Sequence, residues 1–151
     1  MRGKVTALHR NLYTGEITEE TLDLDTLFDL EEEGFDQKLK DQPGLVAWVG
    51  VLLASAEYLK TQAEEAEKDL RERYYLQLKN KGEKTTDKVL TITINRQSKV
   101  LEAREHTNLR TQQHTQLKAI YEAVKDRGRL LQTIAANMRL ERYGMEGRDS
   151  K

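Results

Sequence analysis

The sequence contains no cysteine, a single proline and few aromatic residues. Of its 151 residues, one is Pro and 6% are aromatic. The absence of Cys excludes disulfides, thiolate nucleophiles and Cys-ligated zinc, and it is compatible with a reducing compartment. No segment reaches the ~20 apolar residues of a membrane span, and the first residues lack the apolar core of a signal peptide. These absences predict a soluble, cytoplasmic protein.

The composition is typical of long, solvated helices. Charged residues make up 34% of the chain and hydrophobic residues 37%. A single copy with so small an apolar share has little material for a core of its own, so we expect copies of the chain to associate.

Charge is separated along the chain, although the net charge is only -1. Residues 16–41 carry eleven Asp or Glu and two Lys, a balance of -9, whereas residues 68–139 carry sixteen Lys or Arg and eight Asp or Glu, a balance of +8. This asymmetry favours a polyanion or an acidic partner for part of the molecule. The competing interpretation is that helices of mixed charge are simply soluble.

The first 41 residues give two local predictions. Residues 1–24 are rich in strand-favouring side chains and contain the turn-forming pair Thr14-Gly15, so they form either a β-hairpin or a disordered extension. From Asp25, a plausible N-cap, the sequence predicts a short acidic helix that Gly34 weakens or interrupts. The segment 41–44 (DQPG) should end that element and start the next, because proline disfavours a helical residue before it.

A heptad repeat predicts a long helix from Pro43 to about Lys79. Apolar residues recur with spacings of 4 and 3 and form a seam, which slips by one position after Leu70 towards Tyr74 and Leu78. The seam consists of Leu45, Val49, Leu52, Ala56, Leu59, Ala63, Ala66 and Leu70. A basic loop, residues 79–84, follows, with Gly82 supplying the break.

A second long helix is predicted from about Arg96 to Tyr143, ended by Gly144 and Gly147. Its C-terminal half carries a seam of Leu117, Ile120, Val124, Leu131, Ile134 and Met138, with Arg127 at the expected position in between. Its middle, residues 104–116, is polar and represents either a buried polar layer or a solvated surface. The β-branched run 89–94 before it is a helical turn or a short strand.

Together these patterns predict an all-α fold, an elongated hairpin of two long amphipathic helices that assembles as a homo-oligomer. The expected organisation is an N-terminal extension (1–24), a helical domain (25–143) and a flexible tail (144–151). No catalytic constellation is present: there is no nucleophile motif and no glycine-rich phosphate loop, so we expect no enzyme activity and no cofactor. His106 and His114 are two helical turns apart, too far for one metal, so no metal site is expected.

Cations interleaved with tyrosines mark the end of the first long helix. Lys and Arg neutralise phosphates, and tyrosine rings are stacking platforms for unpaired bases, so the combination suits single-stranded nucleic acid. The candidate residues are Lys68, Arg71, Arg73, Tyr75, Lys79, Lys81 and Lys84; Tyr74 continues the apolar stripe, which favours a packing role. A secondary basic cluster, Lys125, Arg127 and Arg129, lies on the other long helix.

The order of these features over residues 24–142 resembles the UvsY-like recombination mediators of bacteriophages. The resemblance is carried by DLEEEGFDQKLKDQPGLV leading into WVGVLLASAEYLK, by DLRERYY, and above all by AIYEAVKDRGRLLQTIAANMRLE. In that family a lysine, an arginine and a glycine occur in the order of Lys125, Arg127 and Gly128. A basic pair before the tyrosines contributes to DNA binding there; by position it falls on Asp69 and Arg71, so this chain departs from the family pattern at the first member of the pair.

The resemblance implies a mediator that assembles into a ring-like homo-oligomer, a hexamer or heptamer. Such a protein binds single-stranded DNA and helps a RecA-like recombinase to replace single-strand-binding protein, in the cytoplasm of a phage-infected bacterium. The alternative function is that of a structural coiled-coil protein, an assembly factor or scaffold without nucleic-acid binding, in which the separated charges serve contacts between copies.

Overall fold

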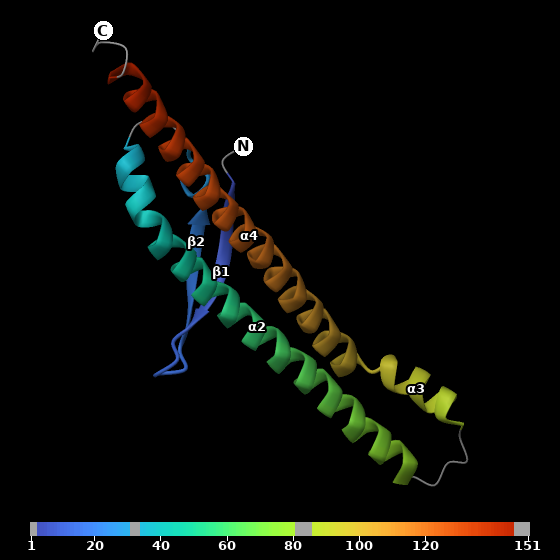
Figure 1. Ribbon diagram of the computed structural model, residues 1–151. Coiled ribbons are helices and arrows are strands. Elements are labelled where there is room, and N and C mark those ends of the chain that lie inside the picture. The colour runs from blue at the N-terminus through green and yellow to red at the C-terminus, as the bar shows by residue number, and fades with distance from the viewer. Residues whose placement is uncertain (1–2, 31–33, 81–85, 147–151) are drawn as a thin grey trace. The chain divides into compact units, whose positions relative to one another are not determined.

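The computed structural model describes residues 3–30, 34–80 and 86–146, with side chains up to residue 141. These residues form a small sheet and mainly helices, two of them long, which confirms the predicted helical class (Figure 1). The elements are β1 (Lys4–Arg10), β2 (Ile17–Asp23), α1 (Leu24–Leu27), α2 (Phe35–Asn80), α3 (Asp87–Asn95) and α4 (Ser98–Glu146). The chain divides into a first unit, Met1–Leu53 with Leu117–Lys151, and a second unit, Ala54–Gln116. Both α2 and α4 contribute to each unit.

The N-terminal segment is a β-hairpin, one of its two predicted states. Strands β1 and β2 pair antiparallel, from Lys4 opposite Asp23 to Arg10 opposite Ile17. Asn11 closes the turn, because its Oδ1 accepts hydrogen bonds from two backbone N–H groups, and Gly15 adopts a φ of +71° that suits glycine. Each strand contributes one buried side chain, Ala7 from β1 and Leu22 from β2, to the core of the first unit.

The N-cap of helix α1 lies two residues earlier than predicted. Its N-cap is Asp23, whose side chain accepts hydrogen bonds from the backbone N–H groups of Asp25 and Thr26, so the prediction of Asp25 as the N-cap was wrong. The helix is a single turn, and Leu27 is its buried residue. Gly34 interrupts the acidic segment as expected, since it has a φ of +69° directly before α2.

Helix α2 begins at Phe35 and passes through Pro43, so the predicted boundary at residues 41–44 was wrong. Proline inside a helix costs about 3 kcal/mol because it removes one N–H donor and its ring crowds the preceding turn. Two buried side chains on the N-terminal side of Pro43, Phe35 and Gln42, offset that cost. Burial of a phenylalanine alone is worth about 1.5–3 kcal/mol.

The first unit contains a buried polar junction between α2 and α4. The Nε2 of Gln42 donates to the carbonyl oxygen of Val124 at 2.6 Å, and its Oε1 accepts from Nη1 of Arg127. Nε and Nη2 of Arg127 also donate to the carbonyl oxygen of Asp29, at 3.1 and 3.0 Å. Gly128 makes room for this arrangement, because a Cβ there would lie only 3.1 Å from Gln42. The junction thus ties the segment before α2 to α4.

In the second unit, α2 and α4 pack through polar as well as apolar side chains. Thr107 donates to the carbonyl oxygen of the buried Ala63 at 3.2 Å, and the half-buried His114 pairs with Glu57. Leu109, the one large apolar residue of segment 104–116, is exposed. The polar middle of α4 therefore combines the two predicted states, with some side chains in the helix contact and others in solvent.

The remaining boundaries differ modestly from the predictions. The run 89–94 lies within helix α3, where Leu90 and Ile94 are buried. Helix α4 begins at Ser98 and continues through Gly144 to Glu146, so Gly144 does not stop it; Gly82 and Gly147 lie outside the described residues. Among the helices described here, none is long and apolar enough to cross a membrane.

Candidate nucleic-acid interface

The C-terminal part of α2 carries the described members of the candidate DNA-binding set. Arg73 and Lys79 are exposed, whereas Arg71 and Tyr75 are half-buried. The Nζ of Lys79 lies 5.5 Å from the centroid of the Tyr75 ring, one helical turn away, a cation–π distance. The hydroxyl of Tyr75 lies 3.4 Å from Oδ1 of Asp87 at the start of α3. The structure thus brings Tyr75, Lys79 and α3 together.

Arg71 is held by a carboxylate instead of projecting freely into solvent. Its Nη2 lies 2.6 Å from Oε1 of Glu67, whose side chain is only 12% exposed. Arg104 of α4 approaches the same oxygen at 3.6 Å and donates to Oδ1 of Asn95 at 3.0 Å. Two guanidinium groups therefore share one carboxylate, which leaves an excess positive charge at this point of the second unit.

The other candidate residues near the tyrosines contribute less. Lys68 is highly exposed and lies 4.0 Å from Glu72, a surface pair of little energetic weight. Asp69, which occupies the position of a basic residue in the mediator family, is exposed. Lys81 and Lys84 lie outside the described residues. Among the described cations at this end of α2, Lys68, Arg73 and Lys79 are therefore exposed, and Arg71 is half-buried.

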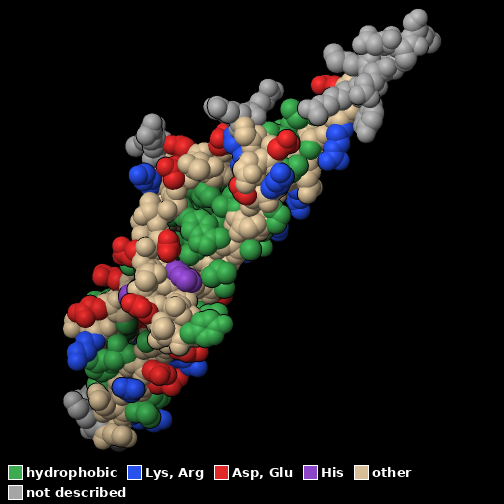
Figure 2. All heavy atoms as spheres, turned by 90° about the vertical axis from the view of Figure 1, so that its left-hand side faces the viewer, with side chains coloured by type: hydrophobic (Ala, Val, Ile, Leu, Met, Phe, Trp, Pro, Cys, Tyr) green, Lys and Arg blue, Asp and Glu red, His purple; other side chains and the backbone are tan. Residues whose placement is uncertain are grey.

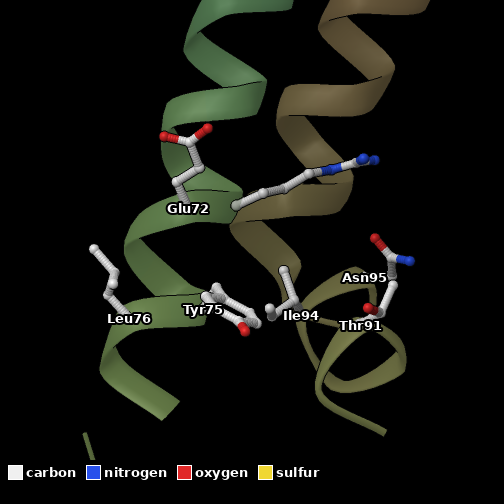
Figure 3. Close-up of a pocket in the computed structure, with 7 residues that line it drawn as sticks. Glu72, Tyr75, Leu76, Thr91, Ile94 and Asn95 are labelled. Carbon is white, nitrogen blue, oxygen red and sulfur yellow. The ribbon is translucent and has the colours of Figure 1, made fainter. Parts of the chain in front are cut away.

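A pocket lies between the C-terminal part of α2 and helix α3 (Figure 3). Its volume is about 430 Å³. In the close-up, Tyr75 lies at the centre, between side chains of α2 on one side and of α3 on the other, and its ring is turned towards Ile94. The lining consists of Arg71, Glu72, Tyr75, Leu76, Thr91, Ile94 and Asn95.

Sequence reasoning missed three contributors to this pocket, Thr91, Ile94 and Asn95. Thr91 and Ile94 belong to the β-branched run 89–94, whose conformation the sequence left open between helix and strand, and Asn95 follows it directly. A helix places residues 91, 94 and 95 on one face, because they are three and four positions apart, whereas a strand would place residue 94 on the face opposite residues 91 and 95. The sequence therefore contained one indication of these residues, their helical spacing, but this spacing is informative only if the segment is assigned as a helix.

The secondary basic cluster has one member that is not available at the surface. Arg127 is only 7% exposed and is occupied in the polar junction with Gln42 and Asp29. Lys125 lies 3.1 Å from Glu122 and 5.3 Å from the centroid of the Tyr121 ring, and Arg129 lies 2.9 Å from Asp126. Arg127 therefore has a structural role in the first unit, which also accounts for an arginine at a position of the apolar seam.

The seam residues line the contacts between α2 and α4 within each unit. Of the fourteen seam residues, eight are buried, five are half-buried and one, Ala66, is exposed. The shift of the α2 stripe thus begins at Ala66, before Leu70, because Glu67 turns inward to the two arginines. The buried set is Val49, Leu52, Ala56, Ala63, Leu117, Ile120, Val124 and Leu131, and the half-buried set is Leu45, Leu59, Leu70, Ile134 and Met138.

Large apolar side chains also remain in solvent in both units. Trp48, Val51 and Leu130 of the first unit, and Leu101 of the second, are about 40–50% exposed. Figure 2 shows a face on which hydrophobic side chains gather between interspersed acidic and basic ones. Such exposed apolar surface is available for association between copies.

Comparison with protein-family models, curated proteins and solved structures finds no significant match for this chain. Among the described residues there is no group of three or more His, Asp or Glu placed to hold a metal ion. What the described side chains offer chemically at the α2–α3 end is an excess of cationic over acidic side chains, the ring of Tyr75 and a pocket that Tyr75, Leu76 and Ile94 help to line.

Proposed function

We propose that this protein binds single-stranded DNA at the C-terminal end of α2 and acts as a recombination mediator of the phage type. The observation that carries the proposal is the placement of Arg71 and Lys79 one helical turn before and after Tyr75, beside an open pocket, with the exposed Arg73 on the same segment of α2. Cations and an aromatic ring are what a single strand requires of a protein surface.

The charge around this site supports a polyanionic ligand. Residues 68–80 and 86–104 contain eight Lys or Arg and four Asp or Glu, an excess of four positive charges. Residues 16–41, by contrast, are strongly acidic, with a balance of -9. A single strand carries one negative charge per nucleotide, so its affinity for the basic stretch falls as salt rises.

One copy offers few contacts to a strand, so its affinity for single-stranded DNA is expected to be low. Self-association is the proposed means of raising that affinity. In a ring-like homo-oligomer, one strand meets several copies, and each contact after the first benefits from a high effective concentration. The exposed apolar side chains of both units, such as Trp48 and Leu101, are candidates for the contacts between copies.

The mediator role itself rests on the sequence resemblance. In this proposal, the assembled protein holds the strand while a RecA-like recombinase replaces single-strand-binding protein, and no covalent step is involved. The acidic segment 16–41 is then available for a basic protein partner.

Fluorescence anisotropy with a dye-labelled oligothymidylate at about 50 mM and about 200 mM salt tests the DNA-binding step. The informative variant is Arg73→Ala with Lys79→Ala; the matched control, Lys40→Ala with Lys118→Ala, removes the same charge from exposed positions of the first unit. At ~0.7 per contact on a single strand, the first pair should lower the slope of log affinity against log salt by about 1.4. No binding at low salt, or equal losses in both variants, would refute the proposed site.

A further inference from the structure

The pocket between α2 and α3, here called the Tyr75 pocket, has features that indicate a more specific ligand than a cationic surface alone would select. Its volume of about 430 Å³ falls within the range of about 300–1,000 Å³ typical of small-molecule sites. All its lining residues belong to the second unit. A ligand of the size of one nucleoside fits such a volume, whereas a folded segment does not.

The aromatic ring in this pocket has neighbours at its hydroxyl and at its face. The hydroxyl of Tyr75 lies 3.4 Å from Oδ1 of Asp87, and Nζ of Lys79 lies 5.5 Å from the ring centroid. Ile94 is buried beside it, while Leu76, also in the lining, is 57% exposed. A flat apolar ligand would stack on this ring and cover an apolar side chain that is now in water.

Two charged side chains line the pocket, Arg71 and Glu72. Arg71 and Arg104 share the carboxylate of Glu67, and Arg104 extends to Asn95, so a polar chain links α2, α4 and α3. The Nε of Arg71 is buried, and among the described residues it has no hydrogen-bond acceptor. Two guanidinium groups against the one carboxylate of Glu67 leave positive charge at this edge for an anionic oxygen.

We propose that the Tyr75 pocket takes one nucleobase of a single strand, stacked on Tyr75, with the adjoining phosphate at the Arg71–Arg104 edge. This inference rests on the proposed function and adds the ligand of the site. The combination of an apolar floor, an aromatic ring and a cationic edge matches a nucleotide. An apolar side chain from a second copy would fill the floor but leave the cationic edge unused. Because every base has a stacking face, little sequence preference is expected.

Comparison of an oligothymidylate with an abasic oligonucleotide of equal length separates binding of the base in the pocket from binding of the phosphates. Both carry the same phosphates, but only the first has bases to enter the pocket. Base stacking on an aromatic side chain is worth about fivefold to 150-fold in affinity, so the wild-type protein should prefer the oligothymidylate by about tenfold. Tyr75→Phe keeps the ring and should retain this preference, whereas Tyr75→Leu should lose it.

A plugged pocket provides an independent variant. Thr91→Trp fills the Tyr75 pocket from α3, and Thr115→Trp on α4 is its control. Both threonines are exposed, and each donates to the carbonyl oxygen four residues earlier at 2.9 Å. Thr91→Trp should reduce the preference for the oligothymidylate to near one while binding to the abasic strand persists; Thr115→Trp should leave the preference unchanged.

Photo-crosslinking locates the base without any substitution in the protein. An oligonucleotide containing 4-thiothymidine should crosslink to the tryptic peptide 74–79 or to the tryptic peptide 89–96, which carry Tyr75 and Ile94. Crosslinks confined to other peptides would overturn the pocket assignment.

The remaining outcomes are also decisive. Equal affinity for both oligonucleotides would refute the nucleobase pocket and leave the DNA-binding function standing, whereas no binding to either would reject both. A change in oligomeric state of Thr91→Trp without DNA would show that a second copy occupies the pocket, and it too would overturn the inference.

Discussion

Replacement of Arg127 by alanine distinguishes a structural arginine from a DNA-binding one. The side chain is 7% exposed and makes three hydrogen bonds, two to the carbonyl oxygen of Asp29 and one to the side chain of Gln42. Its removal leaves both acceptors without these donors inside the first unit. A buried polar group that loses its partner costs about 1–3 kcal/mol, so the two together predict a loss of about 2–6 kcal/mol.

Arg129 supplies the matched control on the same helix. It is highly exposed and pairs with Asp126 three residues earlier, an arrangement worth about 0–0.5 kcal/mol. Arg129→Ala should therefore leave stability nearly unchanged, although both substitutions remove the same charge. The predicted loss for Arg127→Ala is large beside the total stability of about 5–15 kcal/mol that is usual for a domain.

Urea denaturation at a fixed protein concentration measures both effects. Trp48 is the single tryptophan and belongs to the first unit with Arg127, so its emission reports on the relevant part of the molecule. The unfolding midpoint should fall markedly for Arg127→Ala and stay near the wild-type value for Arg129→Ala. Equal midpoints for the two variants would refute the structural role of Arg127.

Further predictions concern glycine and proline in the two long helices. Gly128→Ala should destabilise the protein by about 1–3 kcal/mol, because the new Cβ would meet the hydrogen-bonded Gln42 at 3.1 Å and its displacement outweighs the ~1 kcal/mol gain in helix propensity. Gly44→Ala, with no atom within 4 Å of the new Cβ, should instead stabilise the protein by about 0.5–1 kcal/mol. Thermal unfolding should therefore show a lower melting temperature for Gly128→Ala and a higher one for Gly44→Ala. A shift of both melting temperatures in the same direction would contradict this reasoning. Pro43→Ala should raise stability by up to about 3 kcal/mol, since it restores an N–H donor to the carbonyl of Leu39, and a lower melting temperature would count against an uninterrupted α2.

Several local elements followed from the sequence because their determinants are local. The turn at Thr14-Gly15 and the break at Gly34 depend on the backbone freedom of single glycines, and both occur. The two long helices were expected because their apolar spacing extends over many turns. The prediction that Pro43 starts a helix failed because the burial of Phe35 and Gln42 depends on tertiary packing, and both residues lie before the first residue of the seam, Leu45.

The candidate site was only partly predictable for the same reason. The sequence supplied Arg71, Arg73 and Tyr75, but the pairing of Arg71 with Glu67 and the approach of Arg104 require two helices to be placed side by side. Likewise, Arg127 occupies a seam position in the sequence, yet its acceptor, the carbonyl of Asp29, lies 98 residues away in the chain. Long-range contacts of polar side chains leave no periodic trace.

Sedimentation velocity of the protein with a dye-labelled oligothymidylate tests the central claim most directly, because it follows assembly and DNA binding together. The absorbance of the dye reports the strand, and the protein alone provides the reference. The protein is expected to sediment as a homo-oligomer, and the labelled strand to sediment with it at low salt and to be released at high salt. A monomeric protein and a strand that sediments as free oligonucleotide at every salt concentration would contradict it.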